Sequence, residues 1–356
     1  MQILGQMSGS SLDGFDIACV DFKESNGGIS WSLLQAETYS YSSATKALLS
    51  SVREQTADQI VRTEFQYSVE LADALIDFKT RHNCLASTVS VHGHTVLHYP
   101  SMQKSWQLLN PGLLVSRTSL NLIHDFRSQD MAMGGQGTPM AVIADRDLFP
   151  GYDYYLNLGG IANISGKDNS HWYAYDLAPF NQVHNYFALK TGLDYDKDGK
   201  LAKQGGWDSK LLKLLRSNAY LAKQVPKSLD NAEVFQHWIK PLEETKKPIP
   251  AILFNFNLFM AEMLAEILSI RKGRILITGG GAKNCFFIEL LHSRVKNWTE
   301  LCIPEEDLID YKEAILMAYM GYLRIHRMSN FISDASGAST DVCAGGLYLS
   351  KKDLRP

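Results

Sequence analysis

The chain has 356 residues, more than a single compact core usually holds, and this length predicts two domains. Hydrophobic residues make up 45% of the chain and charged residues 21%, as in an ordinary globular protein. The formal net charge is −3 and no long run of Lys and Arg occurs, so a nucleic-acid-binding surface is not indicated. The first residues lack the basic flank and apolar core of a signal peptide, and no apolar run approaches the length of a membrane span. We therefore expect a cytoplasmic protein with neither a nucleic-acid nor a membrane partner.

The cysteines and histidines give little sign of a metal centre. The cysteines are Cys19, Cys84, Cys285, Cys302 and Cys343. They never form a C-x-x-C pair, so we expect buried, reduced thiols rather than a disulfide framework or a zinc site. The histidines cluster only at His92, His94 and His98, where no cysteine or carboxylate nearby completes a ligand set. A strand-end loop that contacts a polar ligand is therefore favoured there over a metal site.

The first stretch with a functional pattern is residues 3–22. Two apolar runs, Ile3-Leu4 and residues 17–22, flank a loop rich in Gly, Ser and Asp, which is typical of a β-hairpin. Glycine permits close approach of a ligand, and consecutive N–H groups with Ser hydroxyls can surround phosphate oxygens. An ordinary polar hairpin is the alternative. The loop is not a Walker A motif, because Phe15-Asp16 replaces the required Lys-Ser/Thr, and it is not a nucleophile elbow, because Ser8 comes one position late.

The residues that follow alternate between strand and helix patterns. Residues 29–41 are mostly extended in pattern, and residues 58–82 carry apolar side chains at helical spacing. A β-branched run over residues 87–91 ends at His92-Gly93, a type of strand exit where α/β folds place ligand groups. Further elements are expected at residues 105–109 (strand), from Pro111 (short helix), at residues 120–123 (strand) and at residues 140–148 (helix). The glycine cluster at residues 133–139 is interpreted as the passage between domains.

The pattern of strand, glycine turn, strand and strand returns after Tyr154. The repeat consists of residues 155–158, Gly159-Gly160, residues 161–165 and residues 172–175. It begins about 150 residues after the first, which is the size of one domain. We therefore predict two duplicated α/β domains, each offering a turn to a shared cleft. The predicted domains are residues 1–130 and 131–335, and the segment 336–356 is expected to pair back onto the first.

An acidic segment at residues 194–199 resembles the first half of a calcium loop. Asp194, Asp196, Asp198 and Gly199 fit the EF-hand pattern, but Gly205 stands where the bidentate Glu is required. A plain turn is therefore favoured over a calcium site.

A second glycine turn lies between a predicted strand and a predicted helix. Residues 274–278 form a short apolar run, and Gly279-Gly280-Gly281 with Asn284 precede a helical pattern that ends near Val295. A strand, a glycine turn and a helix N-terminus together can hold a flat base or a phosphate. A tight packing turn is the alternative.

Two more helices are expected in this part of the chain, at residues 258–271 and 311–328. Glu313 would lie in the first turn of the second one. A carboxylate at that position can simply favour the helix dipole.

Motifs spread over nearly the whole chain are informative as an ordered set. They are residues 7–16, 91–98, Asp125-Phe-Arg127, residues 134–139, 157–163, 195–199 and 279–284. In this order they resemble the anhydro-N-acetylmuramic acid kinase family. The resemblance implies an α/β fold of two duplicated actin-like (sugar kinase, heat-shock chaperone and actin) ATPase domains around a central cleft. It also implies ATP and Mg²⁺ as cofactors, a small-molecule sugar substrate and a homodimer.

The resemblance further implies a reaction. Water, ATP and 1,6-anhydro-N-acetylmuramic acid would give N-acetylmuramic acid 6-phosphate and ADP, a step in the recycling of cell-wall murein. Opening of the anhydro ring requires water to attack the anomeric carbon, and a carboxylate can take the proton. The oxygen released from the ring would accept the γ-phosphoryl group, so catalysis depends on alignment and on stabilisation of the transferring charge.

Positions that match the family motifs receive implied roles. Asp176 falls at the catalytic Asp position and would be the base, and Glu313 falls at the second acidic position and would orient the water. The implied nucleotide-binding residues are Gly9, Ser10, Ser11, Leu12, Asp13, Gly14, Phe15, Asp16, Asn157, Gly159, Gly160, Asn163, Gly279, Gly280, Gly281 and Asn284. The implied sugar-binding residues are His92, Gly93, Thr95 and Asn181. Mg²⁺ would be held mostly through phosphates and water, with Asp13 or Asp16 as the candidate protein ligand.

Several positions depart from the family pattern. Asp176 is followed by Leu-Ala-Pro-Phe-Asn181 where Thr-Gly-Pro-Gly-Asn is usual, and the bulky Phe180 is expected to narrow the pocket beside the base. Asn110 replaces a family Asp that could meet a sugar hydroxyl, and Ser119 and His124 stand where Gly is usual. Two alternatives therefore stay open: a non-catalytic nucleotide- and sugar-binding paralogue, and a kinase for a different amino or anhydro sugar.

Overall fold

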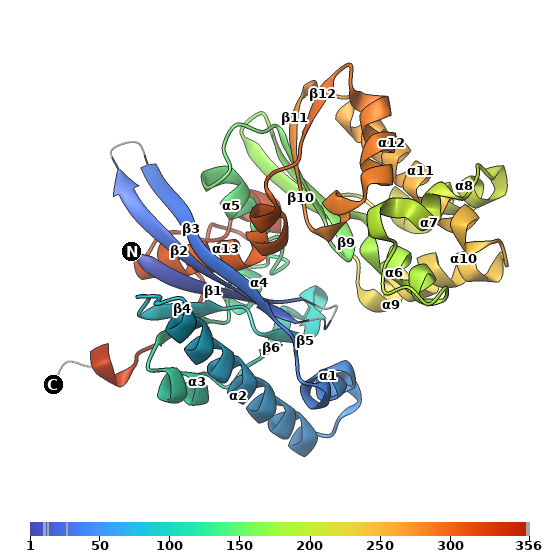
Figure 1. Ribbon diagram of the computed structural model, residues 1–356. Helices are drawn as coiled ribbons and strands as arrows, with labels where there is room; N and C mark the ends of the chain where they lie inside the picture. Colours follow the sequence, from blue (N-terminus) through green and yellow to red (C-terminus); the bar gives the residue numbers. More distant parts are fainter. Residues whose placement is uncertain (10–11, 13, 26–27, 354–356) are drawn as a thin grey trace. The chain divides into compact units, whose positions relative to one another are not determined.

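The computed structural model describes all residues except 10, 11, 13, 26, 27 and 354–356, and its contacts divide the chain into two compact units (Figure 1). Unit 1 comprises Met1–Pro150 and Tyr311–Pro356, and unit 2 comprises Gly151–Asp310. Residues 131–150 and 311–335, which the sequence prediction placed in the second domain, thus belong to unit 1. An ion pair between the buried side chains of Asp145 and Lys312, 2.6 Å long, joins these two segments inside that unit.

Unit 1 contains a six-stranded sheet in the order β13-β7-β4-β1-β2-β3. Its strands are β1 (Gln2–Ser8), β2 (Phe15–Ser25), β3 (Gly28–Tyr39), β4 (Thr88–Val91), β7 (Asn121–His124) and β13 (Gly346–Tyr348). Strands β1, β2 and β3 are antiparallel neighbours, whereas β4 is parallel to both β1 and β7. The predicted return of the C-terminal segment to the first sheet is seen in β13, which pairs antiparallel with β7. A separate two-stranded sheet contains β5 (His94–Tyr99) and β6 (Lys104–Leu108).

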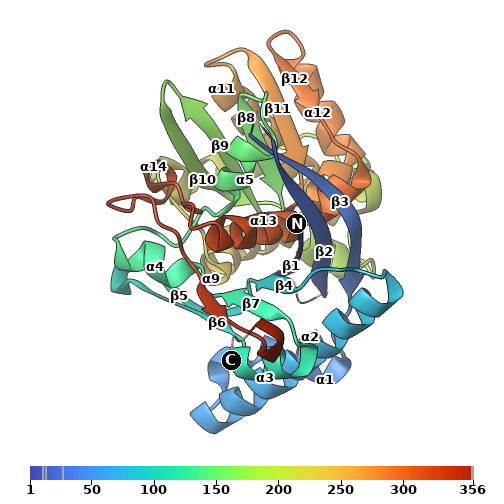
Figure 2. The same ribbon diagram turned by 90° about the vertical axis from the view of Figure 1, so that its left-hand side faces the viewer.

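Helices cover both faces of the main sheet of unit 1 (Figure 2). Helix α2 (Ala57–Arg81) begins with a capping box made by Thr56 and Gln59, and it packs on the face that presents Leu4. Because successive strand residues face opposite sides, Gly5 lies on the other face, against α13 (Glu306–Ile325). A Cβ atom on Gly5 would overlap the carbonyl oxygen of Ala314, so only glycine lets the helix approach the strand this closely. The other helices of unit 1 are α1 (Ser43–Ser50), α3 (Pro111–Thr118), α4 (Arg127–Ala132), α5 (Ala141–Asp147) and α14 (Ser333–Ser336).

Unit 2 contains a five-stranded sheet in the order β10-β9-β8-β11-β12. Its strands are β8 (Tyr154–Leu158), β9 (Ile161–Asp168), β10 (His171–Pro179), β11 (Gly273–Thr278) and β12 (Thr299–Cys302). Its helices are α6 (Asn181–Leu189), α7 (Lys200–Lys203), α8 (Ser209–Arg216), α9 (Asn231–Val234), α10 (Lys240–Glu244), α11 (Ile249–Leu268) and α12 (Cys285–Val295). Strands β8, β9 and β10 form an antiparallel meander, and β11 is parallel to β8 and β12.

The two units repeat one topology. The order β3-β2-β1-β4-β7 in unit 1 corresponds strand by strand to β10-β9-β8-β11-β12 in unit 2, with three antiparallel strands followed by two parallel ones. The predicted duplication of an actin-like α/β fold is therefore confirmed.

Helix α11 is the central helix of unit 2. It begins at Ile249, earlier than the predicted residue 258, because Pro250 is tolerated in a first helical turn. It is long and apolar enough by length and composition to cross a membrane, which corrects the expectation that no apolar run approaches that length. Of its most apolar window, 61% is buried, and it supplies much of the hydrophobic core of the unit.

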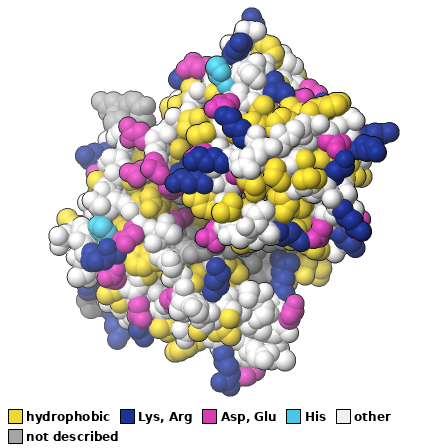
Figure 3. All heavy atoms as spheres, turned by 45° about the vertical axis from the view of Figure 1, so that its right-hand side comes forward, with side chains coloured by type: hydrophobic (Ala, Val, Ile, Leu, Met, Phe, Trp, Pro, Cys, Tyr) yellow, Lys and Arg dark blue, Asp and Glu magenta, His cyan; other side chains and the backbone are white. Residues whose placement is uncertain are grey.

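The surface carries charges of both signs, and the thiols differ in their exposure. Basic and acidic side chains are interspersed on the face shown in Figure 3, in keeping with the small net charge. All five cysteines are free: Cys19 and Cys84 are buried as expected, whereas Cys285 is exposed and Cys302 and Cys343 are partly exposed. The expectation of buried thiols is therefore wrong for the last three.

Candidate active site

The carboxyl ends of three parallel strands of unit 1 bring predicted residues to one edge of the sheet. Gln6 of β1 is paired with Val91 of β4, and the backbone N–H of His92 continues this ladder by donating to the carbonyl oxygen of Gln6 at 3.1 Å. The parallel strand β7 ends beside them and leads to Arg127. The end of β1, where the predicted phosphate loop begins, the His92-Gly93 turn after β4 and Arg127 after β7 therefore meet at the edge where α/β sheets bind ligands.

His92 is held in one neutral tautomer at this edge. Its Nδ1 lies 2.8 Å from the carbonyl oxygen of Gly93, and its Nε2 lies 3.0 Å from Nη2 of Arg127. A carbonyl only accepts and a guanidinium only donates, so Nδ1 carries the hydrogen and Nε2 accepts. Burial, together with the positive charge of Arg127, lowers the pKa of His92 well below its usual value. Both ring nitrogens are thus already used within the protein.

Arg127 is a site candidate that the sequence reasoning did not assign, although it belongs to the motif Asp125-Phe-Arg127. Its guanidinium donates to His92 through two nitrogens, Nε at 3.1 Å and Nη2 at 3.0 Å. Burial lowers the pKa of Arg127 to about 10, and the negative charge of Glu313 opposes this shift. Arg127 therefore stays protonated at neutral pH and connects His92 to Glu313 electrostatically.

Gly93 and Thr95, the other predicted sugar-binding residues of unit 1, have evident roles in the fold. Gly93 has a φ of +81°, and a Cβ there would lie only 3.0 Å from the carbonyl oxygen of Leu108, so the turn requires glycine. Thr95 lies in β5, where its hydroxyl accepts a hydrogen bond from Gln107 at 3.5 Å.

The predicted phosphate loop is described in part. Ser10, Ser11 and Asp13 lie outside the described residues. Gly9 follows the end of β1 and is partly exposed, and Leu12 has a left-handed φ of +59°, a conformation that bulky side chains rarely adopt. These two residues remain candidates for phosphate contact.

The end of the loop leads directly into the core of unit 1. A Cβ on Gly14 would overlap the carbonyl oxygen of Tyr39, so packing alone requires this glycine. The Phe15 side chain is 2% exposed and stacks on Tyr39, with 5.9 Å between ring centroids, which leaves only its backbone for a ligand. Asp16 is partly exposed and accepts a hydrogen bond from the Thr38 hydroxyl at 2.6 Å.

Glu313 lies well inside helix α13, which begins at Glu306 rather than at residue 311. The first-turn explanation for this carboxylate is therefore wrong. Its side chain reaches solvent, yet the surrounding protein desolvates the carboxyl group and raises its pKa. The negative charge of Asp16 adds to this increase, while the positive charges of Lys312 and Arg127 oppose it.

In unit 2, four polar residues form a row across neighbouring strands. Asp176 of β10 is paired with Asn163 of β9, Asn163 with Asn157 of β8, and Asn157 with Thr278 of β11. Directly paired residues point to the same face of a sheet. The alternate strand residues, such as Leu156 and Ile277, belong to the core that α11 packs against, so the row occupies the face opposite α11.

Three of these four residues were predicted as site residues, and the register brings them side by side. Thr278 was not predicted, although it immediately precedes the glycine turn. It is fully buried, and its hydroxyl has no hydrogen-bond partner among the described residues, which marks it as a candidate neighbour of a polar ligand.

Asp176 is fixed by a segment that lies about 50 residues further along the chain. Its carboxylate Oδ2 accepts from the backbone N–H of Leu229 at 2.9 Å. Its own N–H donates to the carbonyl oxygen of Lys227 at 3.0 Å, and its carbonyl oxygen accepts from the Tyr220 hydroxyl at 2.8 Å. Burial raises the pKa of Asp176 to about 6, and the hydrogen bond from Leu229 limits the increase. A carboxyl group with this pKa suits general acid–base catalysis near neutral pH.

The glycines of the two turns in unit 2 fall into two classes. Gly279 has a φ of +79°, and a Cβ on Gly281 would lie 2.5 Å from the ring of Phe180, so the fold itself requires both. At Gly159 and Gly280 a Cβ would lie no closer than 3.5 Å to any atom, and neither residue has a left-handed φ. At Gly160 the nearest atoms would be 3.3 Å away. Gly159 and Gly280 are therefore the positions where close approach of a ligand best explains the choice of glycine.

Two predicted ligand residues of unit 2 have their side chains engaged in the fold. Asn181 donates from Nδ2 to the carbonyl oxygen of Leu158 at 3.0 Å and so braces the Gly159-Gly160 turn. Asn284 caps α12 by accepting from the N–H of Phe287 at 3.0 Å. In the sequence, only the preference of Asn for helix starts indicated these two contacts.

Two residues that depart from the family pattern, Phe180 and Asn110, have roles in the fold. Phe180 is fully buried and packs against Phe287, with 4.8 Å between ring centroids. The expectation that it narrows the pocket beside Asp176 is therefore wrong. Asn110 caps α3 by accepting from the N–H of Leu113 at 3.0 Å, a task that an Asp performs equally well. Ser119 adopts the left-handed conformation in which glycine is usual, and His124 is buried.

The acidic residues of unit 2 and the histidines of unit 1 do not build a metal centre within the described part of the chain. No group of three His, Cys, Asp or Glu residues there could hold a metal ion. Asp196, from the half calcium loop, instead accepts from the N–H groups of Leu201 and Ala202 at the start of α7. The residues therefore fit Mg²⁺ only as an ion held mainly by phosphate and water, with Asp16 as the predicted candidate ligand that lies among the described residues.

Comparisons with known proteins agree with the motif pattern. The family model described as anhydro-N-acetylmuramic acid kinase matches residues 1–350. The anhydro-N-acetylmuramic acid kinase of Aliivibrio fischeri is 29% identical in an alignment 366 positions long, gaps included, that covers 97% of this chain and 98% of that protein. The protein of the same name from Zymomonas mobilis is 30% identical in an alignment of 353 positions that covers 93% of this chain and 94% of that protein.

Solved structures show more distant likeness. The activator of the 2-hydroxyisocaproyl-CoA dehydratase from Clostridium difficile with bound ADPNP is 15% identical with a TM-score of 0.44, over 92% of this chain and 97% of that chain. A putative N-acetylmannosamine kinase from Listeria monocytogenes is 13% identical with a TM-score of 0.39, over 92% and 100%. Because the family model and the relatives match over nearly their whole length, the chain belongs to the anhydro-N-acetylmuramic acid kinase family.

Proposed function

We propose that this protein is an ATP-dependent phosphotransferase with an alcohol acceptor. It opens 1,6-anhydro-N-acetylmuramic acid hydrolytically and phosphorylates it to N-acetylmuramic acid 6-phosphate, in the recycling of cell-wall murein. Family membership and the names of the full-length relatives support the reaction. The observation that carries it is Asp176, a carboxylate fixed by the backbone, with a pKa of about 6, in register with Asn163 and Asn157.

Asp176 is the proposed general base. It takes a proton from water as the water oxygen attacks the anomeric carbon and the bond from that carbon to the bridging oxygen breaks. With a pKa of about 6, the carboxylate is mostly ionised at pH 7 and still basic enough to assist. Its hydrogen bond from Leu229 holds the accepting group in one orientation, which favours a near-attack geometry. Glu313, with Arg127 nearby, is proposed to orient the water.

The bridging oxygen then attacks the γ-phosphorus of ATP, and the bond to the leaving ADP oxygen breaks. Backbone groups at Gly159 and Gly280 are proposed to lie against the nucleotide, because nothing in the fold itself requires glycine there. The amides of Asn157 and Asn163 and the loop from Gly9 to Asp16 are proposed to bind phosphate oxygens. Mg²⁺, when bound, neutralises charge on the transferring phosphoryl group, and Asp16 is proposed to hold it through water.

The alternatives left open by the sequence have lost their main support. A non-catalytic paralogue and a kinase for another sugar were suggested by the changes at Phe180 and Asn110. Phe180 packs in the core and Asn110 keeps a helix cap, so neither change bears on the chemistry of Asp176.

A cytoplasmic location and a homodimer also belong to this proposal. The family resemblance supports both, and the burial of most of the apolar window of α11 fits a core helix. One chain has a mass of 39.9 kDa. If the protein is a homodimer, light scattering on the purified protein would give twice this mass.

Product analysis tests the activity. The purified protein is incubated with Mg-ATP and 1,6-anhydro-N-acetylmuramic acid, and the sugar is analysed by mass spectrometry. The expected product is heavier than the substrate by one phosphate group and one water molecule. Gain of phosphate without water would indicate an ordinary sugar kinase, and ATP binding without any product would indicate the paralogue.

A further inference from the structure

The segment that fixes Asp176 also lines a cavity on the other side of the same strand. Residues 220–229 supply all three backbone or hydroxyl contacts to Asp176 described above. Tyr175 and Leu177, the two chain neighbours of Asp176, line the cavity. Since neighbouring strand residues face opposite sides, the cavity lies behind the carboxylate, on the face that α11 covers.

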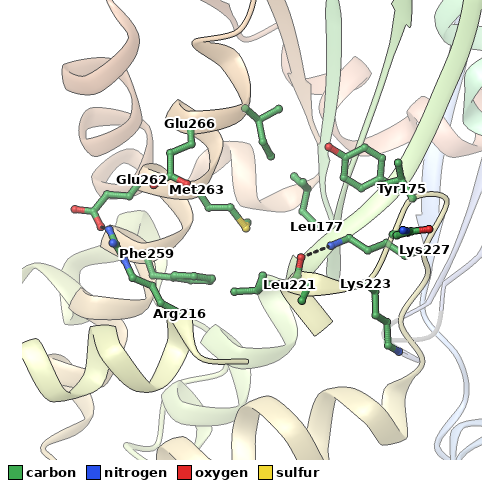
Figure 4. Close-up of a pocket in the computed structure, with 14 residues that line it drawn as sticks. Tyr175, Leu177, Arg216, Leu221, Lys223, Lys227, Phe259, Glu262, Met263 and Glu266 are labelled. Carbon is green, nitrogen blue, oxygen red and sulfur yellow. Dashed lines mark hydrogen bonds and ion pairs between the residues drawn. The ribbon is translucent and has the colours of Figure 1, made fainter. Parts of the chain in front are cut away.

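This cavity is large enough for a small organic molecule. Its volume is about 860 Å³, within the range of small-molecule sites. Phe259 and Met263 of α11 form one wall, and Leu221 and Lys227 of the 220–229 segment form another. Figure 4 shows these side chains, together with Leu177, around one space. All of them belong to unit 2.

The charges around the cavity single out Lys227. Arg216 is paired with Glu262 at 2.6 Å, and Lys223 with Glu233 at 2.9 Å. The partly buried ammonium group of Lys227 has no carboxylate within ion-pair distance among the described residues. It contacts the carbonyl oxygens of Tyr220 and Leu221, both at 3.3 Å. Glu266, the other charged lining residue, is exposed.

Two consequences follow from this arrangement. A molecule with an apolar body and one anionic group matches both the apolar walls and the ammonium group of Lys227. Because such a molecule would bridge α11 and the 220–229 segment, it would stabilise the segment in the conformation that holds Asp176.

We propose that this cavity is a binding site for a small apolar anion and that its occupancy fixes the segment 220–229 on Asp176. The apolar body lies against Phe259, Met263 and Leu177, and the anionic group binds Lys227. The effect of this fixation on catalysis rests on the proposed function, because it requires Asp176 to be the base. The site itself and the ordering of the segment do not.

Binding is tested with 8-anilinonaphthalene-1-sulfonate, an aromatic monoanion whose fluorescence rises in apolar surroundings. The probe is titrated into the full chain and into Lys227→Gln, with Lys223→Gln as the matched control because Lys223 already has a carboxylate partner. We expect saturable binding that weakens at least about tenfold in Lys227→Gln, since an ionic hydrogen bond is lost, and stays within about twofold in the control.

A second variant keeps the test decisive if Lys227→Gln disturbs the segment. Met263→Trp leaves Lys227 in place and puts a bulkier ring on the wall that the apolar body is proposed to contact, so it should weaken probe binding while circular dichroism stays unchanged. Saturating Mg-ATP should not displace the probe, since the cavity lies behind the face that carries Asp176. Unchanged affinity in both Lys227→Gln and Met263→Trp, or displacement by ATP, would overturn the assignment.

Hydrogen exchange tests the link to Asp176 without any turnover. The amide protons of Asp176 and Leu229 report directly on the two backbone contacts. At a probe concentration ten times its Kd, both amides should exchange about tenfold more slowly. Exchange that does not respond to bound probe would refute the coupling. Probe binding and hydrogen exchange can be interpreted even if the product analysis shows no phosphorylated sugar. Failure of the cavity proposal can therefore be distinguished from failure of the proposed function.

Discussion

The two units share one strand order but place different chemistry on it. In unit 1, His92, Arg127 and Glu313 come from two strand exits and a helix, and they interact through a guanidinium group. In unit 2, Asp176 and Asn163 lie in one register across the sheet. The duplicated topology thus fixes where polar groups can gather, while the residues at those places decide whether a unit supplies a charged network or a single carboxylate.

The glycines show the same division. In unit 1, Gly5 and Gly14 are needed because other backbone groups touch them. In unit 2, Gly159 and Gly280 have room for a Cβ. Packing therefore explains Gly5 and Gly14, and an external ligand is the better explanation for Gly159 and Gly280.

The largest expected effect is at the base. Asp176→Asn keeps the shape and the hydrogen bond from Leu229 but cannot accept a proton, so we expect turnover to fall by roughly 10²–10⁴-fold while ATP affinity is retained. The matched control is Asp168→Asn, an exposed carboxylate of the same sheet, which should keep its rate. A near-normal rate in Asp176→Asn would show that Asp176 is not the general base.

The pH dependence follows from the raised pKa of Asp176. The base must be ionised, so kcat/KM should fall as the pH drops through about 6, by about tenfold for each further pH unit. The residual kcat/KM of Asp176→Asn should not show this decrease at low pH. A wild-type profile that stays flat from pH 5 to pH 8 would contradict the assignment.

The raised pKa of Asp176 also affects the stability of the folded protein. A carboxyl group whose pKa is higher in the folded state favours folding when protonated, and this contribution is lost as the pH rises through about 6. Asp176→Asn is neutral at every pH, so at pH 8 it should melt no lower than the wild type. A clearly lower Tm would show that the ionised carboxylate stabilises the unit.

A pair of alanine variants separates the two classes of glycine in unit 2. Gly281→Ala forces a methyl group into the ring of Phe180 and should lower the free energy of unfolding by about 1–3 kcal/mol. Gly280→Ala should leave Tm unchanged and weaken ATP binding by about tenfold, or ~1.4 kcal/mol. If both variants changed only Tm, Gly280 would have no role at the nucleotide.

The smallest effect on activity is expected at Asn110, a residue of unit 1 that departs from the family pattern. Asn110→Asp restores the usual carboxylate and preserves the cap on α3, so the KM for the sugar should change by less than about twofold. A decrease in KM of tenfold or more would show that this carboxylate binds the substrate.

The sequence predicted the parts of this molecule that depend on local pattern. The two strand and glycine-turn repeats, the long helix after Thr56 and the strand that ends before Gly279 are all present. The register was not predicted. The strand before Asp176 was expected to cover residues 172–175, whereas β10 continues to Pro179 and places Asp176 inside the strand. Within the hairpin, Asn157 and Asn163 face each other.

The parts that depend on distant contacts were not predictable. Nothing near Asp176 indicates that Leu229 and Lys227 would hold it, and Phe180 gives no local sign that it packs in the core rather than beside the base. The unit boundary also depends on distant contacts, because the Asp145–Lys312 ion pair joins segments that are far apart in the chain. Helix α13 begins early because Glu306 and Asp307 favour its first turn.

The fate of the water oxygen tests the central claim most directly. The reaction is run with ATP and 1,6-anhydro-N-acetylmuramic acid in water enriched in ¹⁸O, and both products are analysed by mass spectrometry. Attack on the anomeric carbon, assisted by Asp176, predicts one heavy oxygen on that carbon and none in the transferred phosphate. Heavy oxygen in phosphate, or a phosphorylated sugar without it, would contradict the account.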